Sequence, residues 1–185
     1  MAGFRRVATR RGITQAAMAA LGVQRATDGQ LLALVEIDRN HCGTCFADGI
    51  QMATGCTFGK GNIQSLGYGK HAVTLIDTRT GRSVRVVAKP ETVQRSRQSE
   101  FMKYRRTGTP ASQIDSSLVE PMIDMMLTTP AEEIFRIGPV EQREVSLKPH
   151  SFDSVTCAKC GEAVVEPYAR VKGGQIVCIP CAEKA

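Results

Sequence analysis

The sequence of 185 residues lacks tryptophan, has only 5% aromatic residues and contains no run of 18 or more apolar residues. The missing apolar run predicts that no helix spans a membrane. The first residues, MAGFRRVATRRGITQ, carry basic side chains but no apolar core of a secretory signal, so we expect a cytoplasmic protein. Hydrophobic residues still make up 42% of the chain, which is enough for one medium domain with a small appendage.

Acidic residues are absent from residues 1–27, which contain five arginines, and the net charge of the chain is +6. Five more basic residues lie between Arg95 and Arg106. Such stripes are typical of proteins that meet nucleic acid or an acidic partner, but also of a solvated helix face. A nucleic-acid-binding regulator is therefore the alternative function, although so few aromatic rings leave few platforms for base stacking.

The order of apolar runs predicts an α+β fold with an antiparallel sheet. Helices are expected over residues 13–21, 46–54, 91–106 and 116–129, with a short helix through Phe135. Strands are expected over 31–38, 71–77, 82–89 and 140–147, the middle two forming a hairpin. We expect this domain to span residues 1–148, with its helical part at about 91–137, and a second domain to span 149–185.

The second domain contains two CxxC pairs separated by 17 residues, the spacing of a four-cysteine zinc site. The predicted ligands are all protein thiolates, so the site is expected to be structural, although two redox dithiols would give the same pattern. A hairpin across KGG would bring the pairs together, and the helix-forming tail AEKA favours a treble-clef-like finger over a plain zinc ribbon. The predicted zinc ligands are Cys157, Cys160, Cys178 and Cys181.

Three further cysteines occur in the stretch CGTCFADGIQMATGCTFGKGN, residues 42–62. Cys45 and Asp48 would lie in the first turn of a helix, whose dipole stabilises a thiolate, and Cys56 follows the end of that helix. Together they form the candidate catalytic or redox set, and a second metal near Cys45 and Cys56 is a further hypothesis. The glycine-rich turn suggests an anion-binding nest, so the candidate binding residues are Gln51, Gly59, Lys60 and Gly61. Buried structural cysteines are the alternative, because free cysteine is among the most buried residue types.

The pattern Cys45-x-x-Asp48-x-Ile50-Gln51-x-x-Thr54-Gly55-Cys56-Thr57-x-Gly59-Lys60-Gly61-Asn62, followed by Gly69-Lys70 and a hairpin, resembles the FmdE family of formylmethanofuran dehydrogenase proteins. The resemblance runs from about Gln15 to Arg85, and many members also carry a C-terminal cysteine finger. It implies an α+β core, zinc binding and an association with molybdenum or tungsten formylmethanofuran dehydrogenases.

The chain departs from that family at its start, where members typically have a His-Gly-His-x-Cys-Pro segment and this sequence has MAGFRRVATRRG. His41 and Cys42, which lie outside the shared pattern, are candidates to replace the missing ligands, and His71 is a weaker one.

The function predicted from these features is that of a zinc-binding accessory or redox partner of a molybdenum or tungsten oxidoreductase. Asp48 and Gln51 would place a substrate or a supporting hydrogen bond. A homodimer through the helices between 91 and 137 is predicted as well. Whether the chain catalyses a reaction is left open.

Overall fold

The computed structural model describes residues 2–37, 44–145 and 152–184, with side chains described from Gly12 and from Phe46 onward in the first two ranges. The chain divides into two compact units, residues 1–147 and 148–185. Among the described residues no helix combines the length and the apolar character that crossing a bilayer requires.

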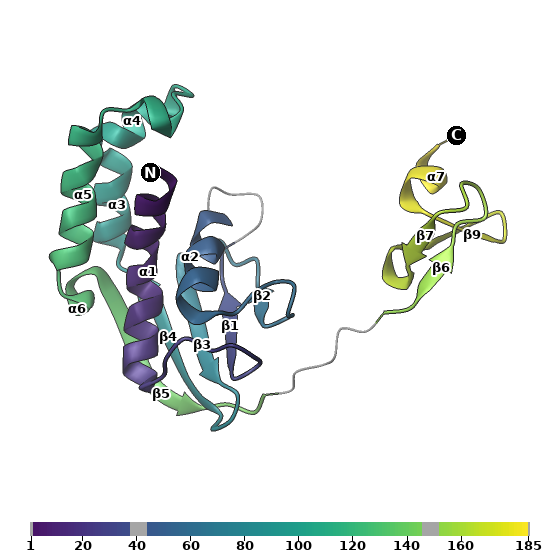
Figure 1. Ribbon diagram of the computed structural model, residues 1–185, viewed down its shortest axis with the longest axis horizontal. Helices are drawn as coiled ribbons and strands as arrows, with labels where there is room; N and C mark the ends of the chain where they lie inside the picture. The colour runs from purple at the N-terminus through teal and green to yellow at the C-terminus, as the bar shows by residue number, and fades with distance from the viewer. Residues whose placement is uncertain (1, 38–43, 146–151, 185) are drawn as a thin grey trace. The chain divides into compact units, whose positions relative to one another are not determined.

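The first unit is built on a five-stranded sheet (Figure 1), which with its helices confirms the α+β class. The strand order is β2-β1-β3-β4-β5, and all neighbours are antiparallel except β1 and β2, which are parallel. The short strand β2 was not predicted, because three residues are too few to show an alternating pattern. The strands are β1 (Leu31–Val35), β2 (Ile63–Ser65), β3 (Ala72–Asp77), β4 (Arg82–Ala88) and β5 (Phe135–Gln142).

Two helices, α1 (Ala2–Leu21) and α2 (Thr44–Thr54), pack on one face of this sheet. Helix α1 contacts β3, β4 and β5 as well as α2, and it starts earlier than the predicted residue 13. Because side chains alternate along a strand, every second residue points at the helices. The resulting core contains Ile13, Ala17, Leu21, Ala33, Val35, Ile50, Val73, Leu75, Val84 and Val86.

The chain between β4 and β5 is helical and contributes little to that core. It forms α3 (Pro90–Gln98), α4 (Glu100–Arg106), a 3-10 turn η1 (Ala111–Gln113), α5 (Ser116–Thr128) and α6 (Ala131–Ile134). The single helix predicted over 91–106 is interrupted at Ser99, whose side chain accepts a hydrogen bond from the Met102 amide and thereby caps α4. Neither α3 nor α4 has a buried residue, and α5 has only Ile123.

The last strand of the first unit lies earlier than predicted. The alternation in VEQREVSL placed it at residues 140–147, whereas β5 runs from Phe135 to Gln142. Phe135 is buried in the core, so the strand begins directly after α6. The register with β4 shifts between Val84 and Val86, opposite Gly138 and Pro139, and this bulge moves the alternation out of phase.

The second unit is small and is organised around its cysteines. Its elements are β6 (Ser154–Thr156), β7 (Ala163–Val165), a 3-10 turn η2 (Glu166–Tyr168), β8 (Arg170–Lys172), β9 (Gln175–Val177) and α7 (Ile179–Glu183). The hairpin β8-β9 turns at Gly173 and Gly174, both with positive φ, as KGG predicted. One cysteine pair follows β6 and the other opens α7, which confirms the treble-clef-like finger.

The contact between the end of α2 and the segment before β1 depends on a glycine. Gly55 has φ +78°, and a Cβ there would lie 2.0 Å from the Ala26 carbonyl oxygen. Gly22 has a similar φ of +68° but open space around it. We expect Gly22→Ala to lower the free energy of unfolding by about 1 kcal/mol, the cost of a left-handed residue. Gly55→Ala should lower it by considerably more, because the backbone must also move.

Urea unfolding of the two variants and the parent chain measures this difference. Gly22→Ala is the matched control, since it carries the same conformational cost without the clash. Equal losses in the two variants would contradict the close approach of Gly55 to Ala26.

Candidate functional site

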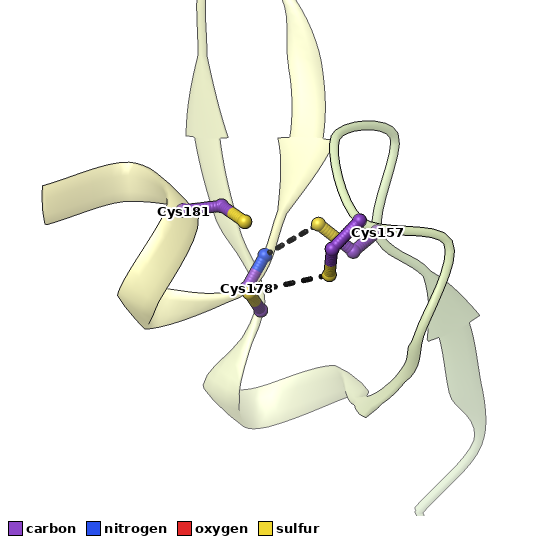
Figure 2. Close-up of side chains that lie close together, drawn as sticks. Cys157, Cys178 and Cys181 are labelled. Carbon is purple, nitrogen blue, oxygen red and sulfur yellow. Dashed lines mark hydrogen bonds between the residues drawn. The ribbon is translucent and has the colours of Figure 1, made fainter. Parts of the chain in front are cut away.

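The four cysteines of the second unit converge on one point (Figure 2). Their sulfur atoms all lie within 4.8 Å of one another, and the Cys160 and Cys178 sulfurs are 3.8 Å apart. A tetrahedral zinc with Zn–S bonds of about 2.3 Å requires sulfurs about 3.8 Å apart, so the residues present fit this metal. All four positions of the tetrahedron are taken by protein, which makes the site structural.

Backbone groups shape this cluster. The Cys157 amide donates to the Glu162 carbonyl and the Gly161 amide donates to the Cys157 carbonyl, each at 2.9 Å, which closes the turn that holds the first pair. Backbone amides of Cys160 and Cys178 that donate to the Cys157 sulfur lower the pKa of that thiol to about 6. Thiolates are the metal-binding form of cysteine, so the backbone prepares this ligand for zinc.

Cys181 shows why the site needs a cation. The neighbouring Cys178 sulfur raises the pKa of the Cys181 thiol, because negative sulfurs repel each other at this distance. A bound zinc ion reverses this effect by supplying positive charge. Within the residues that the structure describes, these four cysteines form the only group of three or more histidine, cysteine or acidic side chains arranged to hold a metal.

Cys56 lies in the core of the first unit and is completely buried. Its sulfur donates a hydrogen bond to the Leu31 carbonyl at 3.3 Å, and burial raises the pKa of its thiol. A neutral thiol with a backbone partner is what a structural cysteine looks like, so these surroundings favour the alternative of a buried structural residue. The metal or redox role of Cys56 stays a prediction.

The turn predicted to be an anion-binding nest uses its donors internally. The Lys60 ammonium donates to the carbonyls of Thr27 (2.6 Å) and Gly55 (3.5 Å). The Lys60 amide donates to the Thr57 hydroxyl, and the Gly61 amide donates to the Phe58 carbonyl. These bonds tie the end of α2 to the segment before β1. An anion-binding role of Gly59, Lys60 and Gly61 stays a prediction, and it would require these bonds to be exchanged.

The other predicted residues of the first unit belong to α2 or to the segment before it. Cys45 lies in the first turn of α2, but its side chain is outside the described part of the chain, as are His41 and Cys42. Asp48 is exposed and Gln51 is half-buried. Their catalytic and binding roles therefore stay predictions.

His71 is brought to the start of α2. Its ring meets Phe46, the residue after Cys45, edge to face with centroids 6.5 Å apart and planes at 88°. This is the arrangement expected if the chain before β3 returns the histidine to the N-terminal end of the helix. It places His71 beside the first turn of α2, whereas its role as a ligand stays a prediction.

One buried ion pair on the other face of the sheet was not predicted from the sequence. Glu36, directly after β1, is 4% exposed and accepts hydrogen bonds from Arg85 Nε (2.6 Å) and Nη2 (2.8 Å). These bonds hold the pKa of Glu36 below its usual value. The only sequence signal was a single acid at the end of an apolar run and a single arginine within a β-branched run, which does not indicate that the two meet.

Comparison with known proteins agrees with this architecture. The family model described as "FmdE, Molybdenum formylmethanofuran dehydrogenase operon" matches residues 12–136, and the chain therefore belongs to the FmdE family. The model described as "Prokaryotic dksA/traR C4-type zinc finger" matches residues 150–185. The resemblance that the cysteine motif indicated is thus confirmed, and so is the finger.

Two individual proteins are similar to the chain. A probable S-adenosyl-L-methionine-binding protein of Archaeoglobus fulgidus is 32% identical over 181 residues, which cover 92% of this chain but 44% of that protein. The chain thus spans less than half the length of this relative. A crystal structure of a tungsten formylmethanofuran dehydrogenase FmdE-like protein from Syntrophus aciditrophicus is 24% identical and shares the fold with a TM-score of 0.55, covering 97% of this chain and 83% of that one.

The geometry of the cysteine cluster predicts its metal content. We expect the purified chain to carry one finger-bound zinc, because the four thiolates fit a single tetrahedral ion. Cys157→Ser should lose this zinc, since three thiolates and a hydroxyl bind it far more weakly. Elemental analysis by mass spectrometry gives the ratio of zinc to protein. Cys56→Ala is the control and should keep the finger zinc; full zinc retention in Cys157→Ser would contradict the assignment.

The Glu36–Arg85 pair predicts a pH dependence of stability. The folded-state pKa of Glu36 lies below its ordinary value of 4.5, so the pair stabilises the fold fully above that pH. This contribution is lost as the pH falls through the folded pKa. The free energies of unfolding of the parent chain and of Glu36→Gln should therefore differ at neutral pH and converge under acid conditions.

Urea unfolding followed by circular dichroism across this pH range measures the convergence. Acid also releases zinc, but the finger is identical in both proteins and cancels in their difference. Glu132→Gln, which removes an exposed glutamate, should stay close to the parent chain at every pH. A constant gap between the parent chain and Glu36→Gln would contradict the lowered pKa.

Proposed function

We propose that this chain is a zinc-dependent accessory protein of a molybdenum or tungsten oxidoreductase of the formylmethanofuran dehydrogenase type. Membership of the FmdE family, shown by the match over residues 12–136, is the observation that carries the proposal. The family takes its description from a molybdenum formylmethanofuran dehydrogenase operon, and the structural relative is described as an FmdE-like protein of a tungsten enzyme. Both descriptions connect the family with the same class of oxidoreductase.

The chemistry of the cysteines supports an accessory role over a redox role. Zinc bound by four protein sulfurs has no open position and does not change oxidation state. Cys56 is buried, and its raised pKa keeps the thiol in the form that reacts poorly. A redox partner would have to rely on Cys45, with His41 or Cys42, and this remains the second interpretation of the same family relationship.

The finger is best understood as a binding module in this proposal. Its core consists of the cysteines and Val177, so the unit depends on zinc for its fold. Outside that core Val171 is 76% exposed and Tyr168 is 62% exposed. Exposed apolar side chains on a small rigid unit are the features that contacts with another protein use.

The alternative of a nucleic-acid-binding regulator receives less support. Part of the basic stripe between Arg95 and Arg106 is engaged in local structure: Arg105 donates to the Thr109 carbonyl and Arg106 to the Arg97 carbonyl. These bonds complete the end of α4. The S-adenosyl-L-methionine binding named for the archaeal relative is not extended to this chain, because more than half of that protein lies outside the match.

The predicted homodimer fits the helical part of the first unit. Met125 and Met126 are half-buried and Leu127 is 58% exposed, although α5 has 13 residues and an apolar side to cover. We propose that two copies pair through these helices, and light scattering of the zinc-loaded chain measures the resulting mass.

Binding of the full, zinc-loaded chain to a purified molybdenum or tungsten formylmethanofuran dehydrogenase tests the main proposal. Biolayer interferometry should detect a complex, and Cys157→Ser should lose it together with its zinc. Cys56→Ala, which keeps the finger, should bind as the parent chain does. A molybdenum enzyme of another family is the negative control for the partner. Absence of binding by the zinc-loaded chain to the dehydrogenase would overturn the proposal.

A further inference from the structure

A hollow of about 240 Å³ lies on the face of the sheet opposite to α1 and α2. Its lining residues in β3 and β4 include Thr74, Ser83 and Arg85, which alternate along the strands with the core residues Val73, Val84 and Val86. The remaining wall comes from β5 and the residues after it. The accessory function involves no residue of this hollow, and neither the cysteine motif nor the finger contributes to it.

Arg85 is held in a fixed position within the hollow. Glu36 accepts from its Nε and Nη2 atoms, and the two side chains differ in exposure, 41% for Arg85 and 5% for Glu36. The carboxylate is therefore beneath the surface and the guanidinium partly above it. Because a guanidinium has five N–H groups and Glu36 uses two, three remain for another partner.

A buried ion pair is a poor means of stabilising a fold, because removing two charges from water offsets most of their attraction. The pair does, however, restrict the arginine to one orientation before a ligand arrives. Preorganisation of this kind strengthens binding, since less conformational freedom is lost when the complex forms. Glu36 thus acts as a positioning residue for Arg85.

Two more arginines flank the hollow. Arg136 is paired with Val87 across the β4–β5 ladder, which places it on the same face as Arg85, and Arg143 follows the end of β5. Both are exposed, and among the described residues neither takes part in an ion pair. Three arginines against Glu36 and Glu141 leave one net positive charge at the site.

Gly138 makes room between these arginines. It lies in the β5 bulge, where a Cβ would come within 3.1 Å of the Arg85 carbonyl oxygen, so the strands approach closely and no side chain fills the space. The hydroxyl of Ser83 donates to the Glu141 carbonyl and keeps the floor of the hollow in place. A volume of about 240 Å³ is below the range of pockets for drug-sized ligands, about 300 to 1,000 Å³.

From this arrangement we infer that the hollow binds a small oxyanion, a carboxylate or a phosphate group, through Arg85, Arg136 and Arg143. Guanidinium groups match the planar geometry of such anions with paired hydrogen bonds. The single excess positive charge suits a ligand with one or two negative charges and not a long polyanion. Binding of such an anion does not depend on the partner proposed for the protein.

Nuclear magnetic resonance of the arginine Nε–H groups tests this inference on the full, zinc-loaded chain. Inorganic phosphate and acetate are titrated separately at constant ionic strength. We expect saturable shifts of the Arg85, Arg136 and Arg143 signals, and the probe that saturates at lower concentration identifies the preferred group.

Arg136→Gln combined with Arg143→Gln should weaken the binding by about tenfold or more, because two charge-assisted contacts are lost. Both side chains are exposed, so this variant should fold. Arg97→Gln combined with Arg170→Gln removes the same charge outside the hollow and should leave the affinity unchanged. The inference fails if neither probe saturates, or if both double variants weaken binding equally.

Discussion

The first unit depends on the burial of one face of its sheet beneath α1 and α2. Ile13, Ala17 and Leu21 of α1 meet the inward side chains of β3 and β4, such as Leu75 and Val84. Because the side chains of a strand alternate, this burial also decides which residues face the other way. The Glu36–Arg85 pair and the arginine-lined hollow lie on that second face as a consequence.

The second unit follows a different constraint, because it is too small to bury a sufficient apolar core. Four sulfur atoms within 4.8 Å of one another replace that core, and Val177 is the main aliphatic side chain packed among them. Such an arrangement is stable only with a metal ion, since thiolates at this distance repel each other. The chain therefore combines one unit held by hydrophobic burial with one held by coordination.

Membership of a family and the role of each motif residue are different questions, and Cys56 and Lys60 illustrate the difference. Both belong to the pattern by which the FmdE family is identified. In the structure Cys56 donates to a backbone carbonyl inside the core, and Lys60 ties two loops together. Gly55 belongs to the same pattern, and its close approach to Ala26 gives a packing reason for it. Part of the motif thus describes how α2 ends and how the next turn is locked.

The sequence by itself determined the features that depend on local spacing: the four zinc ligands, the turn at KGG, the ends of helices at Gly22 and Gly55, and the β3–β4 hairpin. These follow from chain geometry over a few residues and need no knowledge of distant contacts. Tertiary structure decided the rest. The bulge at Gly138 moved β5 relative to its apparent pattern, and strand pairing brought Glu36 to Arg85 across 49 positions of sequence. Burial, which no single stretch of sequence reveals, made Cys56 a neutral thiol with a backbone partner.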